Sequence, residues 1–140
     1  MKKLLFITGS IIILAVIIYG YHEYTRAPMS AKDSPADFVL DASTLANEFK
    51  MDEKAATKKY SGRVLQVKGV LTSFDSYNNI NTIVLKANDM SVRCVLDKMN
   101  NDVSIPAKGS TLIIKGYCTG YNADELLGSD IMMNNGIIIQ

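Results

Sequence analysis

The chain has 140 residues, of which 48% are hydrophobic, and its formal net charge is +1. From Lys32 to the C-terminus it carries 12 lysines and arginines against 13 aspartates and glutamates. A strongly basic surface of the kind that binds nucleic acid through its phosphates is therefore not expected. About a hundred residues remain beyond the N-terminal apolar segment, and a chain of that length forms one hydrophobic core rather than two.

The N-terminal segment predicts a single-pass membrane anchor over residues 1–21. Lys2 and Lys3 precede an uncharged apolar run at residues 4–19. A helix over residues 4–21 would be about 27 Å long, just under the hydrocarbon thickness of a bilayer. No small-residue cleavage site follows the run, so retention is favoured over removal as a signal peptide. Because cytoplasmic flanks are enriched in lysine, we expect the N-terminus in the cytoplasm and the C-terminal domain in the periplasm or another extracytoplasmic space.

The rest of the chain divides into a linker at residues 22–40 and a folded domain at residues 41–140. The stretch from Arg26 to Asp37 is rich in proline, serine and charge and has little that could be buried. Such a composition is typical of a spacer, which would lift the domain off the membrane.

One amphipathic helix is expected at the start of the domain, from Ser43 to Tyr60. Asp41 and Ser43 are candidate N-caps, and Gly62 is suited to end the helix. The apolar side chains fall on one stripe, which consists of Leu45, Phe49, Ala56 and Tyr60. The charged residues between them indicate an ordinary solvated face rather than a binding patch.

From Arg63 onward the hydrophobic period changes to two, which indicates strands. We predict five strands, at residues 63–71, 82–87, 91–97, 110–118 and 126–133. Asn88-Asp89 is expected to form a tight turn, and Gly69 to mark a bend in the first strand. Asn135-Gly136 is expected to turn the chain into a short closing strand at residues 137–140.

Together these elements predict a mainly β domain, a small five-stranded OB-type Greek-key barrel preceded by one amphipathic helix. The polar connection at residues 98–108 is too short for a substantial helix between the third and fourth strands. We therefore expect the helix at residues 43–60 to cover that end of the barrel instead.

Several segments follow one another in a fixed order: Leu45-Ala-Asn-Glu-Phe49, Ala55-Ala-Thr-Lys-Lys-Tyr60, Gly62-Arg-Val-Leu-Gln-Val-Lys-Gly69, Val92-Arg-Cys94, and Lys108-Gly109 leading to Lys115-Gly-Tyr-Cys-Thr-Gly120. This ordered set resembles the tRNA_anti-like family of bacterial OB-fold proteins. The resemblance covers residues 41–133 and implies an OB barrel behind a helix, commonly after an N-terminal membrane or export segment. It implies no established biochemical activity, and the family's name is no argument for tRNA binding.

The two cysteines carry the only covalent chemistry that the sequence supports. Cys94 and Cys118 each share the parity of inward-facing strand residues, so both side chains are expected inside the barrel. In an oxidising compartment this favours a structural disulfide between them. The alternative is a pair of buried free thiols.

Catalysis, metal binding and cofactor binding are not expected. The single histidine, His22, lies beside the predicted anchor, far in sequence from either cysteine, so a Cys-His pair or a zinc site is disfavoured. Asp124, Glu125 and Asp130 are typical of solvated surface, without the spacing of a calcium loop.

Binding remains as the predicted activity. An OB barrel ordinarily binds ligands across its second and third strands and the adjoining loops. The candidate ligand-binding residues are Tyr77, Lys86, Arg93, Tyr117 and Tyr121. Nucleic acid is disfavoured because the outward positions of the second strand, Thr82, Val84 and Lys86, offer no ring for base stacking. We expect a membrane-anchored, non-enzymatic binding module of the bacterial cell envelope that takes a protein, peptide or glycan; the alternative is an oligonucleotide-binding domain.

Overall fold

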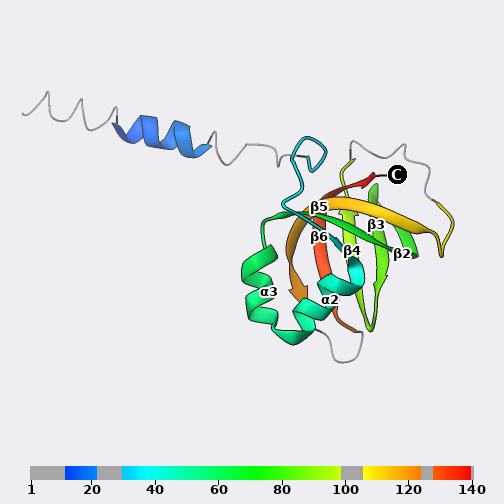
Figure 1. Ribbon diagram of the computed structural model, residues 1–140. Coiled ribbons are helices and arrows are strands. Elements are labelled where there is room, and N and C mark those ends of the chain that lie inside the picture. Colours follow the sequence, from blue (N-terminus) through cyan, green and yellow to red (C-terminus); the bar gives the residue numbers. More distant parts are fainter. Residues whose placement is uncertain (1–11, 22–29, 99–105, 124–127, 140) are drawn as a thin grey trace, which may run out of the picture.

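A computed structural model describes residues 12–21, 30–98, 106–123 and 128–139 (Figure 1). The helices of the domain are α2 (Ala42–Met51) and α3 (Glu53–Tyr60). The strands are β1 (Phe38–Asp41), β2 (Val64–Tyr77), β3 (Ile80–Ala87), β4 (Met90–Leu96), β5 (Thr111–Asn122) and β6 (Asp130–Ile139). His22, Asp124 and Glu125, which the sequence analysis considered, lie outside the described residues.

Five of the strands form a closed barrel. They follow one another in the order β2-β3-β4-β6-β5, and β5 pairs back with β2 to close the sheet. The β4–β6 pair is parallel and the other four barrel pairs are antiparallel. This is the arrangement of an OB-type barrel, so the predicted fold class is confirmed. β1 falls in the predicted linker and was not expected; it lies outside the barrel and pairs in parallel with the first half of β2.

The predicted single helix is two helices. Asp52 separates them with extended backbone angles, φ −153° and ψ 94°. Its carboxylate accepts a hydrogen bond from Ala55 N at 2.9 Å, which caps α3 and explains the break. The predicted apolar stripe is confirmed, because Leu45 and Phe49 belong to the same buried core as the barrel strands.

The predicted turn in the C-terminal segment is also wrong. β6 runs without interruption through Asn135-Gly136, which was expected to form a turn. Instead, the register of β6 shifts there against both β4 and β5, so the pair forms a bulge, with Asn135 at φ 51°. Gly136 lies against Cys94 Sγ, and an added Cβ would overlap that sulfur. The chain therefore needs glycine at this position for close approach rather than for a reversal.

The predicted spacer is also partly wrong, because residues 30–37, here called the strap, pack on the barrel. The Asp37 carboxylate accepts a hydrogen bond from Val64 N at 2.8 Å. Ser34 Oγ shares a hydrogen bond of 3.0 Å with the Tyr117 hydroxyl. Ala31 is completely buried. Only the part of the predicted spacer before residue 30 lies outside the described structure.

The predicted membrane anchor falls largely on residues outside the described structure, including Lys2 and Lys3. Residues 12–21 are helical, and their large apolar side chains are exposed, by 60% at Leu14 and more at the others. Among the helices that the structure describes, none has both the length and the apolar character needed to cross a bilayer. The transmembrane part of the prediction is therefore not confirmed.

Candidate functional site

The outward side chains of β3 and β4 form one surface of the barrel, here called the open face. Alternate residues of both strands point into the core, and those between them point outward. The outward residues are Thr82, Val84, Lys86, Ser91, Arg93 and Val95; of these Lys86 is exposed, Val84 is buried and the other four are partly exposed. None of these six is aromatic, so the surface offers no ring on which a base or a sugar could stack.

Arg93 was predicted to bind a ligand, but the structure pairs it with an acidic neighbour. Its Nε and Nη2 atoms donate to Asp130 Oδ2 at 3.2 and 3.1 Å. Asp130 begins β6, the strand next to β4 in the barrel. This pair places a carboxylate beside the only arginine of the open face and links β4 to β6.

Two of the three predicted tyrosines also make structural contacts. The Tyr117 hydroxyl binds Ser34 of the strap. The Tyr121 ring stacks on Phe49 of α2, with 5.3 Å between ring centroids. Tyr77 is different, because it lies at the end of the β2–β3 hairpin and is 77% exposed. The structure therefore does not bring the five predicted residues into one site, and of the five only Tyr77 and Lys86 are fully on the surface, whereas the other three are partly buried.

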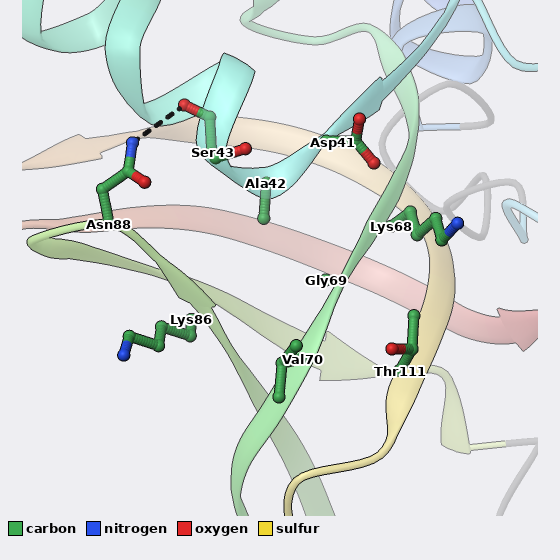
Figure 2. A pocket seen from close by; sticks show the side chains of 9 residues that line it. All are labelled: Asp41, Ala42, Ser43, Lys68, Gly69, Val70, Lys86, Asn88 and Thr111. Atoms are coloured by element: carbon green, nitrogen blue, oxygen red, sulfur yellow. Dashed lines mark hydrogen bonds between the residues drawn. The ribbon is translucent and has the colours of Figure 1, made fainter.

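A pocket of about 370 Å³ lies beside Lys86, where β2 changes its neighbour from β1 to β3 (Figure 2). Asp41 is the last residue of β1 paired with β2, and Lys86 is paired with Val70. The pocket is lined by Asp41, Ala42, Ser43, Lys68, Gly69, Val70, Lys86, Asn88 and Thr111. Because these residues come from four separate segments of the chain, only Lys86 was predicted as a site residue.

Local packing explains the shape of this pocket. An added Cβ at Gly69 would lie 3.0 Å from Ala42 Cβ and 3.1 Å from Leu85 Cβ, so glycine lets α2 begin close to β2. Asn88 Nδ2 donates to Ser43 O at 3.3 Å and thereby holds the β3–β4 turn against α2. The predicted tight turn at Asn88-Asp89 is confirmed. The irregularity of β2 itself lies between Leu71 and Ser73, not at Gly69.

The chemistry of the pocket is mixed. Its floor of Ala42 and Gly69 is small and apolar, and its rim carries hydroxyl, amide and charged groups. The ammonium groups of Lys68 and Lys86 point away from each other in Figure 2, and the Asp41 carboxylate lies on the side of Lys68. The charged groups around the pocket therefore do not converge on one point.

The predicted disulfide between Cys94 and Cys118 is absent, and both residues are buried free thiols. Both are register partners of Met133, on opposite sides of β6. Two strand spacings place their Cα atoms about 9–10 Å apart. A disulfide requires a separation below about 7 Å, so equal parity did not bring the sulfurs together.

Burial also makes these thiols poor nucleophiles. Complete burial raises the pKa of the Cys94 thiol from 9.0 to about 12. Burial likewise raises the pKa of Cys118, with a hydrogen bond to the backbone of Gly120 opposing it. Both side chains are therefore protonated at neutral pH. Across the described ranges of the chain, no three His, Cys, Asp or Glu side chains are grouped so that they could hold a metal ion.

The free-thiol structure predicts a simple labelling result. In the folded protein at pH 8 we expect neither cysteine to react with a chromogenic disulfide reagent, because both thiols are buried and protonated. Unfolding without a reductant should release both thiols, matching a reduced and unfolded control. Thiols that appear only after reduction would show that the predicted disulfide forms in the protein after all.

Solved structures with a similar fold exist, at low sequence identity. One is a Klebsiella pneumoniae protein named a "putative nucleic acid-binding lipoprotein", with a TM-score of 0.60 and 15% identity over 76% of this chain and 100% of that chain. Another, named a "putative aspartyl-tRNA synthetase", comes from Leishmania major. It has a TM-score of 0.49 and 8% identity over 90% of this chain and 26% of that chain. At these identities the first likeness shows the fold alone.

The search of curated proteins found no match. The tRNA_anti-like family, in contrast, matches residues 1–130, which is most of the chain. That match agrees with the segments that resembled the family in the sequence and with the barrel that those segments build. The chain belongs to the tRNA_anti-like family.

Proposed function

We propose that this chain is a non-enzymatic, membrane-tethered binding module of the bacterial cell envelope, and that its open face binds a protein. The observation that carries the proposal is the chemistry of the open face. It has no aromatic side chain, and its arginine is paired with Asp130. Bases and sugars are both commonly held by stacking on rings, so neither has its usual contact there. A protein partner needs only complementary shape and polar groups, which the open face and the adjoining pocket offer.

Exposed apolar surface supports the tether. Ile12, Ile13 and Leu14 are each exposed by 60% or more, as are the large apolar residues that follow them in the helix at residues 12–21. Exposing an apolar surface of this kind to water is unfavourable, and burying it in lipid is favourable. Lys2 and Lys3 before the run support a cytoplasmic N-terminus and an extracytoplasmic barrel.

Two features support binding rather than catalysis, one inside the barrel and one at the pocket. Cys94 is completely buried and its pKa is raised to about 12, so it does not provide a thiolate. Lys68 and Lys86 at the pocket do not converge on one point. General acid–base or nucleophilic catalysis requires paired groups within hydrogen-bond reach.

Oligonucleotide binding is the second candidate, favoured by the name of the Klebsiella relative and by two lysines beside the pocket. It would use Lys68, Lys86 and the exposed ring of Tyr77. Binding that depends on lysine–phosphate contacts weakens steeply with salt. The two candidates are therefore separable in solution.

The test combines a titration with a crosslinking experiment. In fluorescence anisotropy at 150 mM salt we expect no saturable binding of a fluorescent 20-nucleotide single strand, whether RNA or DNA. A photocrosslinking amino acid at Ser91 on the open face should give a discrete protein adduct in intact cells. The same residue at exposed Lys58 of α3 is the matched control and should not give it. Salt-sensitive oligonucleotide binding that is lost in Lys68→Ala/Lys86→Ala would establish the alternative instead.

A further inference from the structure

We infer that the strap turns the open face away from the membrane, so that the partner of the open face approaches from the side opposite the bilayer. The inference rests on the proposed membrane tether and adds an orientation to it. Three observations support it: the contacts that hold the strap on the barrel, the position of those contacts relative to the open face, and the short length of chain between the strap and the N-terminal helix.

The strap is held along the outer surface of β5. Lys115 Nζ donates to Lys32 O at 3.2 Å, and the Tyr117 hydroxyl meets Ser34 Oγ at 3.0 Å. The Asp37 carboxylate then accepts from Val64 N at 2.8 Å, and Asp37 N donates to Val64 O at 2.8 Å. These contacts follow one another along the chain, so the whole strap is fixed rather than one point of it.

Burial shows that the strap covers apolar surface as well. Ala31, Val64 and Ile137 are buried, yet they do not belong to the core cluster inside the barrel; on the open face the same is true of Val84 alone. Val64 is the register partner of Tyr117, and Ile137 that of Lys115. Val64 and Ile137 therefore lie on the outside of the barrel, beside the two residues that hold the strap.

Strand order places this contact opposite the open face. Around the barrel the order is β2-β3-β4-β6-β5, with β5 joined to β2. In a ring of five strands, the strand opposite the midpoint of β3 and β4 is β5. The chain therefore leaves the barrel toward its N-terminus on the side that lies away from the open face.

The length of the remaining chain then decides the orientation. Nine residue steps separate Tyr21, the last residue of the described N-terminal helix, from Ser30. They span at most about 31 Å. A domain of about 100 residues has a radius of gyration of about 13 Å, so half its circumference is about 50 Å. The chain is too short to pass around the barrel, and the open face cannot turn to the membrane.

The strap itself makes the tether short enough. If residues 30–37 were released, the free chain would reach from Tyr21 to Phe38, which is 17 steps. That length is about 58 Å and exceeds half the circumference of the domain. A protein with a released strap could therefore present any face to the bilayer, and the strap is a positioning device.

Fluorescence energy transfer to the bilayer tests this orientation. The full chain is reconstituted in phosphatidylcholine vesicles that contain a rhodamine-labelled lipid. Single donor labels are placed at Asn134→Cys, next to Tyr117 on the strap side, or at Lys86→Cys on the open face. The native thiols are buried and stay unlabelled in the folded protein. We expect clearly higher transfer efficiency from position 134 than from position 86.

Two variants test the role of the strap. Ala31→Asp with Asp37→Ala should release the strap and bring the two transfer efficiencies together, whereas Ala107→Asp, a matched change at an exposed alanine, should leave the difference intact. Inserting 15 glycine and serine residues after Thr25 lengthens the tether without touching the barrel and should also remove the difference.

Equal transfer from both positions in the parent protein, on vesicles that carry the protein, would overturn the orientation and leave the tether standing. A difference that persists in the lengthened chain would overturn the role of the strap. If the protein does not float with vesicles in a density gradient, the tether is wrong, and the orientation fails with it.

Discussion

Replacing Phe49 with alanine should lower the free energy of unfolding by about 3–5 kcal/mol. The Phe49 ring is only 2% exposed and stacks between Tyr60 and Tyr121, at centroid distances of 6.1 and 5.3 Å. Its removal would leave a cavity between α2, α3 and β5, and the two flanking rings cannot close it without moving their own elements. Urea unfolding followed by circular dichroism measures the loss.

Met51 on the same helix provides the control for this change. Its side chain is 86% exposed, so Met51→Ala should change stability by less than about 0.5 kcal/mol. A comparably small loss for Phe49→Ala would mean that α2 does not close the core. That result would contradict the packing of the helices on the barrel.

Replacing Gly136 with alanine should destabilise the protein by about 3 kcal/mol, at the upper end of the range for overpacked cores. The added methyl group would overlap Cys94 Sγ, which is completely buried and has no room to retreat. Gly136 has no positive φ, so steric overlap rather than backbone strain is the cause. Thermal and urea unfolding of the single variant measure the effect.

A double-mutant cycle isolates the contact. Cys94→Ala removes the sulfur that the new methyl group meets, so Gly136→Ala should cost markedly less in a Cys94→Ala background than alone. If the losses of stability were strictly additive in the double variant, Gly136→Ala would destabilise the protein for a reason other than overlap with Cys94. The cycle uses two small substitutions in one contact, so it does not disturb the helices.

The parts of the fold that the sequence predicted are those with a strong local pattern. Leu65, Val67 and Leu71 alternate with outward residues, and the β2 core face follows this alternation. The break at Asp52 was missed because the apolar stripe continues across it, from Phe49 to Ala56. Asn135-Gly136 has the residues of a hairpin turn, but the chain uses them in a bulge because Cys94 lies opposite. Such a contact between distant strands has no local signal.

The candidate site was less predictable for the same reason. The Tyr117 hydroxyl shares a hydrogen bond with Ser34. The Arg93 guanidinium donates to Asp130. Each partner lies on a distant segment of the chain. Sequence periodicity indicates that a side chain points outward, but it does not indicate which neighbouring residue that side chain contacts. The pocket beside Lys86 is likewise defined by where β1 ends against β2, and β1 is too short to give a pattern.

The pairing of β2 also bears on how the chain folds. The β2–β3–β4 meander is joined by two tight turns and can form from local contacts. Closure is different, because Val64 must meet Tyr117 and Ser91 must meet Asp130, pairs separated by 53 and 39 residues. Pairs so distant in sequence carry a loop-closure cost that slows folding. During synthesis or export the barrel therefore cannot close until β6 has emerged, and until then the edge of β4 is open to pairing with other chains.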